Sequence, residues 1–128
     1  MTRSKRTTLA VAGALSLFAT GILFGANRFN QPKTLLHVVT IQWNEGTTDA
    51  QKQAVYDGIR KMAGDVPGIR SIWTKPIKVQ PEGYDGAFAI EFDSKDALDA
   101  YAKHPAHAEW MKLYSPAHKS SNTHDITN

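Results

Sequence analysis

The sequence predicts an α+β domain in which an antiparallel sheet carries two helices on one face, in the β-α-β-β-α-β order of a ferredoxin-like subunit. Two observations predict this fold. Stretches with strand character alternate with stretches in which apolar residues recur at helical spacing, and turn signals separate them. The first predicted strand is also apolar on both faces, although the helices can cover only one. We expect a second copy of the same sheet to cover the other face, so that the protein is a homodimer.

The first thirty residues have the composition of a targeting segment. Met1–Arg6 holds three basic residues, and Leu9–Ala26 is an uncharged, apolar run of the shortest length usually read as a membrane span. We therefore expect residues 1–30 to be a signal peptide or an N-terminal membrane anchor with a linker, and residues 31–128 to be the domain. The protein would be exported, periplasmic or secreted, or would contact a membrane only through residues 9–26 if these are not cleaved.

The positive charge of the chain belongs to the targeting segment. The whole sequence has 15 Lys and Arg against 12 Asp and Glu, but only 11 of the basic residues and all 12 acidic ones lie in residues 31–128. A nucleic-acid-binding domain would carry a basic patch on its folded part, so we expect no nucleic-acid partner. The sequence contains no cysteine, which excludes disulfides, thiolate nucleophiles and zinc–thiolate sites.

Leu35–Trp43 is the first predicted strand because it is rich in β-branched and aromatic residues. Its alternation places Leu36 and Val38 on one face, and on the other Leu35, His37, Val39, Ile41 and Trp43. A helix is expected after Thr48, because Gln51 lies three residues on and completes a capping box. Gly64 is well placed to end this helix.

The second and third predicted strands are separated by a loop rich in glycine and proline. Ile69–Pro76 is the second strand, Pro81–Gly86 lies in the loop, and Ala87–Phe92 is the third strand. Alternation in the third strand places three large apolar residues on one face, which are Phe88, Ile90 and Phe92.

A proline interrupts the second helical region. Ser94 can cap a helix that ends near Lys103, because Pro105 biases His104 away from helical geometry. Pro105 can then open the next helix as its first residue.

The end of the chain is less patterned. A short helix over residues 107–114 would carry Trp110, and Pro116 would end it. Residues 118–128 are either a last edge strand or a tail.

The proline break brings two residues with acid–base chemistry near each other. Tyr101 ends one predicted helix and His107 lies in the first turn of the next, so both rings can face a common cavity. A neutral imidazole can take a proton from a carbon next to a carbonyl, and a phenol can stabilise the oxyanion that develops. The alternative is structural, with His107 bracing the break and Tyr101 packed in the core. A metal at His104 and His107 would need a third ligand from the distant His37, His118 or His124 or from a carboxylate, and we expect none.

Four segments of the chain resemble the stress-responsive A/B barrel (Dabb) family. They are HVVTIQW at 37–43, VPGI at 66–69, EGYDGAFAIEFDS at 82–94 and DALDAYAKHPAH at 96–107. The resemblance implies a dimeric α/β barrel of ferredoxin-like subunits. Many members of the family have no assigned activity, while a few, including a plant polyketide cyclase, use a tyrosine and a histidine for an aldol-type cyclisation.

Carried over residue by residue, the resemblance implies that Tyr101 and His107 are the catalytic pair. It also implies that His37 is a pocket histidine, although a histidine on an apolar strand face can equally be an interior residue. The chain departs from the cyclase at Gly86, where the cyclase has a pocket histidine. We assign ligand binding to His37, Trp43, Tyr84, Phe88 and His104. The tryptophans can also be explained as core or dimer residues.

Two classes of function remain after this reading. The first is an exported, dimeric Dabb protein that binds a small apolar molecule or has a stress-related role, with no ligand assigned. The alternative is an enzyme without a cofactor, in which Tyr101 and His107 carry out aldol or proton-transfer chemistry. A hollow apolar pocket that contains His37, Tyr101 and His107 would favour the enzyme, and a filled interior would favour the structural protein.

Overall fold

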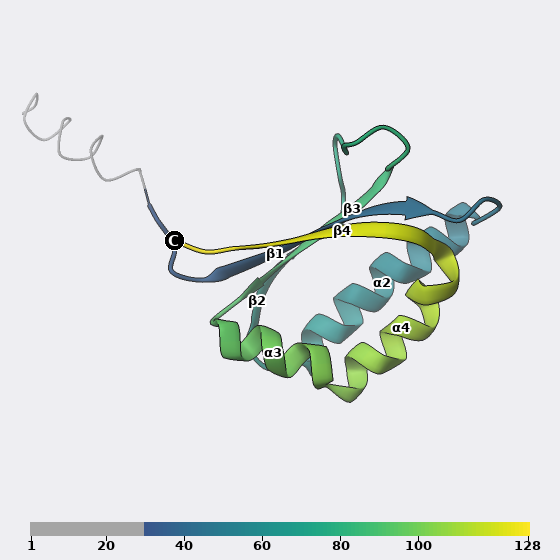
Figure 1. Ribbon diagram of the computed structural model, residues 1–128. Helices are drawn as coiled ribbons and strands as arrows, with labels where there is room; N and C mark the ends of the chain where they lie inside the picture. Colours follow the sequence, from purple (N-terminus) through teal and green to yellow (C-terminus); the bar gives the residue numbers. More distant parts are fainter. Residues whose placement is uncertain (1–29) are drawn as a thin grey trace, which may run out of the picture. The chain divides into compact units, whose positions relative to one another are not determined.

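The computed structural model describes residues 30–128, and within them strands and helices follow in the predicted order (Figure 1). The elements are β1 (Leu35–Trp43), α2 (Asp49–Asp65), β2 (Ile69–Trp73), β3 (Gly86–Phe92), α3 (Lys95–Lys103), α4 (Pro105–Ala117) and β4 (His118–Ile126). The α+β, ferredoxin-like fold class is confirmed, with the second helix of the plan divided into α3 and α4. The predicted targeting segment lies outside the described residues. Within residues 30–128 no helix has both the length and the apolar character to span a membrane.

The strands of the described region form one antiparallel sheet in the order β2-β3-β1-β4, and the helices cover one of its faces (Figure 1). β1 lies in the centre, where His37 is paired with Ile90 of β3 on one side and with Asp125 of β4 on the other. The sequence alone did not decide whether residues 118–128 form a strand or a tail. Pairing with β1 shows that most of this segment is the edge strand β4.

The core lies between the sheet and the helices, as the alternation in β1 and β3 predicts. Its fully buried members are Ile41, Val55, Ile59, Met62, Ile90 and Phe92. The other face of the sheet has no helix over it. Leu36 and Val38 are only half-buried there, and Trp73 and Ile126 are 52% and 56% exposed.

α2 begins as predicted but ends later. The Thr48 hydroxyl accepts a hydrogen bond from the Gln51 backbone N–H at 3.2 Å, and the Gln51 side chain accepts one from the Thr48 N–H at 2.8 Å. The prediction that Gly64 ends the helix was wrong. The chain leaves the helix through Val66 in an extended conformation, so no left-handed cap is needed. The left-handed residue of this turn is Gly68, with φ of 86°.

The break between α3 and α4 is as predicted. Ser94 caps α3, His104 adopts an extended conformation, and Pro105 is the first residue of α4. α4 is longer than predicted, because Pro116 lies in its last turn and does not end it. The carbonyl groups at this end of the helix accept hydrogen bonds from the loop after β1, through the backbone and side chain of Asn44 and the hydroxyl of Thr47.

Candidate functional site

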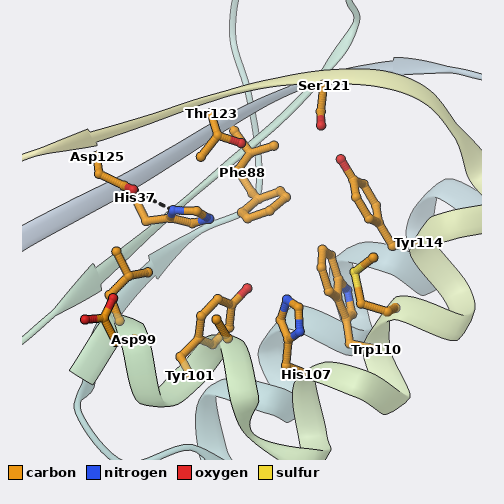
Figure 2. Close-up of a pocket in the computed structure, with 14 residues that line it drawn as sticks. His37, Phe88, Asp99, Tyr101, His107, Trp110, Tyr114, Ser121, Thr123 and Asp125 are labelled. Atoms are coloured by element: carbon orange, nitrogen blue, oxygen red, sulfur yellow. Dashed lines mark hydrogen bonds and ion pairs between the residues drawn. The ribbon is translucent and has the colours of Figure 1, made fainter. Parts of the chain in front are cut away.

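A pocket of about 390 Å³ lies between the helix-covered face of the sheet and the α3–α4 pair (Figure 2). β1 and β3 supply its floor, α3 and α4 supply one wall, and β4 supplies the other. Its lining residues are His37, Val39, Phe88, Leu98, Asp99, Tyr101, Ala102, His107, Trp110, Met111, Tyr114, Ser121, Thr123 and Asp125. The volume falls within the range of ligand pockets in proteins.

His37 enters the pocket from β1 and is oriented by a carboxylate on β4. Its Nδ1 lies 2.6 Å from Oδ1 of Asp125, the residue paired with it across the sheet. The His37 side chain is only 14% exposed. Because Nδ1 bonds to the carboxylate, the other ring nitrogen faces the pocket, as Figure 2 shows.

Tyr101 and His107 meet across the proline break. Tyr101 stands in the last turn of α3 and is 3% exposed, and His107 stands in the first turn of α4. Their ring centroids are 4.7 Å apart with an edge-to-face arrangement, and the centroid of His37 lies 6.0 Å from that of Tyr101. The three rings therefore form one cluster, with the Tyr101 hydroxyl directed into the pocket (Figure 2).

The surroundings of this cluster favour the neutral forms of both groups. Burial lowers the pKa of His107 below its usual value of 6.5, and the nearby His37 lowers it further. Burial raises the pKa of the Tyr101 phenol far above its usual value of 10. At neutral pH the pair is an uncharged imidazole, which can accept a proton, beside an uncharged phenol, which can donate a hydrogen bond.

Aromatic rings of α4 build the apolar wall. Trp110 packs edge-on against Phe88 at 5.7 Å and stacks on Tyr114 at 4.6 Å between ring centroids. The Trp110 indole N–H donates to the carbonyl oxygen of Val55 in α2 at 3.0 Å, which fixes the ring. Residues 107, 110 and 114 follow helical spacing, so the sequence contained the signal that they share a face.

The β4 side of the pocket was missed by the sequence reasoning. Ser121, Thr123 and Asp125 alternate along β4 and pair with the residues of β1 that face the helices. Their alternation would have been informative only if the strand itself had been predicted firmly.

Three of the predicted ligand-binding residues lie elsewhere. Trp43 and Tyr84 border a separate hollow of about 380 Å³ beyond the end of β1. Trp43 occupies the space beside Gly86, where an added Cβ atom would lie 2.6 Å from the indole. His104 does not reach the pocket either, because its Nδ1 accepts a hydrogen bond from the Ala106 N–H at 3.1 Å and so caps α4. Within residues 30–128 no group of three histidine or acidic side chains is arranged to hold a metal ion.

The fold and the pocket together define a ferredoxin-like α+β domain with a ligand-sized cavity under its helices. The chain belongs to the stress-responsive A/B barrel domain (Dabb) family, whose family model matches residues 35–128. This confirms the family that the sequence resembles.

Two curated relatives match over 81 residues each. Olivetolic acid cyclase from Cannabis sativa is 25% identical over 61% of this chain and 80% of the cyclase. The stress-response A/B barrel domain-containing protein HS1 from Arabidopsis thaliana is 24% identical over 61% of this chain and 74% of its own length.

Solved structures have the same fold at lower identity. A dimeric ferredoxin-like protein of unknown function from Thermobifida fusca has a TM-score of 0.66 at 20% identity, over 80% of this chain and 97% of its own. The cofactor-independent oxygenase SnoaB from Streptomyces nogalater has a TM-score of 0.62 at 10% identity, over 76% of this chain and 94% of its own.

Proposed function

We propose that this protein binds a small, mainly apolar molecule in the pocket under its helices. The observation that carries the proposal is the pocket itself, which is hollow and holds His37, Tyr101 and His107 around one space. A purely structural role would be better served by a filled interior, because an unfilled cavity forfeits packing energy. The same argument weakens the reading of Tyr101 and His107 as simple bracing residues.

We further propose that the pocket carries out proton transfer at a carbon next to a carbonyl group. His107 would accept the proton, and the Tyr101 hydroxyl would donate a hydrogen bond to the carbonyl oxygen as it becomes an enolate. His37, held by Asp125, would present its second ring nitrogen to the same oxygen or to a neighbouring one. Return of the proton to another atom, or attack of the enolate carbon on a second carbonyl, would complete an isomerisation or an aldol cyclisation. The relatedness to a cyclase supports this second candidate function.

A test uses 2-tetralone, a fused two-ring ketone with an acidic CH₂ group, and the full chain in D₂O. We expect NMR spectroscopy to show faster exchange of its C1 protons for deuterium than in buffer alone. His107→Ala should abolish the acceleration, and Tyr101→Phe should lower it by about a hundredfold, within the range of a lost oxyanion donor.

The matched control is His104→Asn, which removes a histidine three residues away while keeping a good N-cap for α4. It should exchange protons like the wild type. If 2-tetralone binds but its proton exchange is not accelerated, the binding proposal stands and the proposal of proton-transfer catalysis is contradicted. If 2-tetralone does not bind, the proposal that the pocket takes ring ketones is contradicted.

We also propose that the protein is an exported homodimer. The dimeric protein of the same fold from Thermobifida fusca supports the dimer, together with the uncovered apolar face of the sheet. Export rests on the basic start and apolar run of residues 1–30. Cell fractionation with N-terminal sequencing of the mature protein tests it, and a cytosolic chain that still begins at Met1 or Thr2 would contradict it.

A further inference from the structure

The pocket has two chemically different sides (Figure 2). One side, formed by β3 and α4, is lined by carbon-rich rings and an aliphatic side chain, from Phe88, Trp110 and Met111. The β4 side carries two hydroxyls and a carboxylate, from Ser121, Thr123 and Asp125, at the positions that face the helices. A purely hydrocarbon ligand would pack on the apolar side and leave the polar groups of the β4 side hydrogen-bonded only to water.

Tyr114 adds an unpartnered hydroxyl between these two sides. The residue is 6% exposed, and its hydroxyl oxygen is buried with no well-formed hydrogen bond in the described part of the chain. Burial raises the pKa of this phenol, although Ser121 is near enough to lower it in part. The hydroxyl points across the pocket toward Ser121 (Figure 2). A buried polar group without a partner is uncommon in folded proteins and calls for an explanation. An oxygen atom of a bound ligand within reach of the Tyr114 and Ser121 hydroxyls would supply a better partner.

The charges of the pocket constrain what that ligand can be. None of its lining residues is a lysine or an arginine. Both carboxylates are already paired, Asp125 with His37 at 2.6 Å and Asp99 with Lys95 at 2.6 Å. A ligand with a carboxylate or phosphate would therefore meet two acidic residues and no permanent cation, which is unfavourable in a partly buried site.

The size of the pocket sets the number of rings. A cavity of roughly 150 Å³ accepts one benzene molecule. The volume of about 390 Å³ here therefore accommodates one or two rings with small substituents.

From these observations we infer that the ligand is an uncharged compound of one or two rings that carries a hydroxyl or carbonyl oxygen. Its ring faces pack on Phe88 and Trp110, and its oxygen lies at the subsite formed by the hydroxyls of Tyr114, Ser121 and Thr123. The inference rests on the proposed binding function and specifies the ligand class of the same pocket.

Three matched probes test the inference on the full chain: naphthalene, 2-naphthol and 2-naphthoate. They share one ring system and differ in having no polar group, a neutral hydroxyl or a carboxylate. Isothermal titration calorimetry should show 2-naphthol binding about tenfold more tightly than naphthalene, because one or two net hydrogen bonds are gained. We expect 2-naphthoate to bind more weakly than either.

Single substitutions locate the subsite. Tyr114→Phe and Thr123→Val should each weaken 2-naphthol binding by about three- to tenfold more than they weaken naphthalene binding. The matched control is Thr127→Val, which removes a hydroxyl outside the pocket that donates to the Thr34 carbonyl oxygen. It should leave the affinities for all three probes as they are in the wild type.

Several outcomes would overturn the inference, and they differ from failure of the proposed function. Equal affinity for naphthalene and 2-naphthol would leave the pocket as a binding site but remove the hydroxyl subsite. The subsite would also be removed if Tyr114→Phe left the affinity for 2-naphthol unchanged but lowered the melting temperature. The Tyr114 hydroxyl would then serve the fold, through a hydrogen bond to Ser121, and not the ligand. Tightest binding of 2-naphthoate would contradict the charge argument. Failure of all three probes to bind would overturn both the inference and the proposed function.

Discussion

His107 is surrounded by aromatic rings and a second histidine, and this environment decides what its removal costs. Its ring lies edge-on to Tyr101 at 4.7 Å and tilted to Trp110 at 5.8 Å between centroids, and the side chain is only half-buried. Such a residue has modest packing to lose. The environment thus suits a residue that acts on a ligand better than one that holds the fold together.

We predict that His107→Ala lowers the free energy of unfolding by less than about 1.5 kcal/mol. The comparison variant is Trp110→Ala, which should cost about 3–5 kcal/mol, because that indole is 5% exposed and bonded to the Val55 carbonyl. Urea unfolding of the two variants measures both values. A cost for His107→Ala as large as that for Trp110→Ala would identify His107 as a structural residue and count against the proposed site.

A second prediction concerns pH. The pKa of His107 is lower in the folded protein than its ordinary value of 6.5, so below that pH the unfolded chain binds more protons than the folded one. The stability that neutral His107 contributes is therefore complete above pH 6.5 and is lost as the pH falls through the lowered folded value. We expect the wild type to lose stability relative to His107→Gln between pH 7.5 and pH 5.

Melting curves of both proteins at several pH values measure this difference, in which the effects of the other histidines cancel to first order. The proton-exchange rate of 2-tetralone should fall over the same range, since protonated imidazole cannot act as a base. A difference in melting temperature that does not vary with pH would show that the pKa of His107 is the same in both states.

At the scale of elements, Gly58 of α2 shows how close packing overrides local preference. A Cβ atom there would lie 2.8 Å from Trp110 and 3.2 Å from Leu113, so α2 and α4 approach each other through this glycine. In an exposed helix interior, Gly→Ala stabilises by about 1 kcal/mol. We predict the opposite sign for Gly58→Ala, with a loss of about 1–3 kcal/mol from overpacking.

The matched control is Gly64→Ala in the last turn of the same helix, where an added Cβ atom meets nothing within 4 Å. It should be neutral or stabilising. Thermal unfolding of both variants measures whether each substitution raises or lowers stability. If Gly58→Ala is stabilising, α2 and α4 can move apart at no cost.

The sequence predicted those elements whose signals are local. The strand pattern of β1, the capping box of Thr48 and the helix break at Pro105 all follow from residues that are close together in the sequence. The end of α2 was misplaced because Gly64 has the residue type of a helix terminator, whereas the backbone turns later, at Gly68. The end of α4 was misplaced because its last carbonyl groups are satisfied by Asn44 and Thr47, about seventy positions away.

The candidate site divides in the same way. Tyr101, His107 and His37 were predicted from the helix break, the strand period and the family resemblance, and the structure brings their rings together. The β4 side could not be predicted, because a polar edge strand has a weak pattern of its own and is defined by pairing with β1. The catalytic and binding roles of all these residues stay predictions until a ligand is known.

For the molecule as a whole, the feature that needs an explanation is the uncovered face of the sheet. Leu36 and Val38 of β1 are half-buried on this face, and Trp73 and Ile126 are more than half exposed. The β2–β3 connection extends from the sheet on the side away from the helices (Figure 1) and carries Ile77 fully exposed. Apolar surface of this kind, exposed on several neighbouring strands, is typical of an interface.

We predict that the protein is a homodimer at micromolar concentration, with the uncovered faces of two sheets packed together. An obligate interface of this kind buries more than about 2,000 Å² in total, and a tryptophan that becomes buried commonly contributes much of its energy. Trp73→Glu places a charge at that position and should raise the dimer dissociation constant by at least about tenfold. Light scattering across a dilution series measures the mass of the wild type and the variant.

The matched control is Leu113→Glu in α4, which introduces the same charge at a leucine that is 44% exposed and borders the groove between α2 and α4 in the helix layer. Because that layer faces away from the proposed interface, this variant should remain dimeric. A monomeric wild-type protein at micromolar concentration would contradict the predicted homodimer. A dimer disrupted by Leu113→Glu and not by Trp73→Glu would move the interface to the helices and leave the open face of the sheet for another partner.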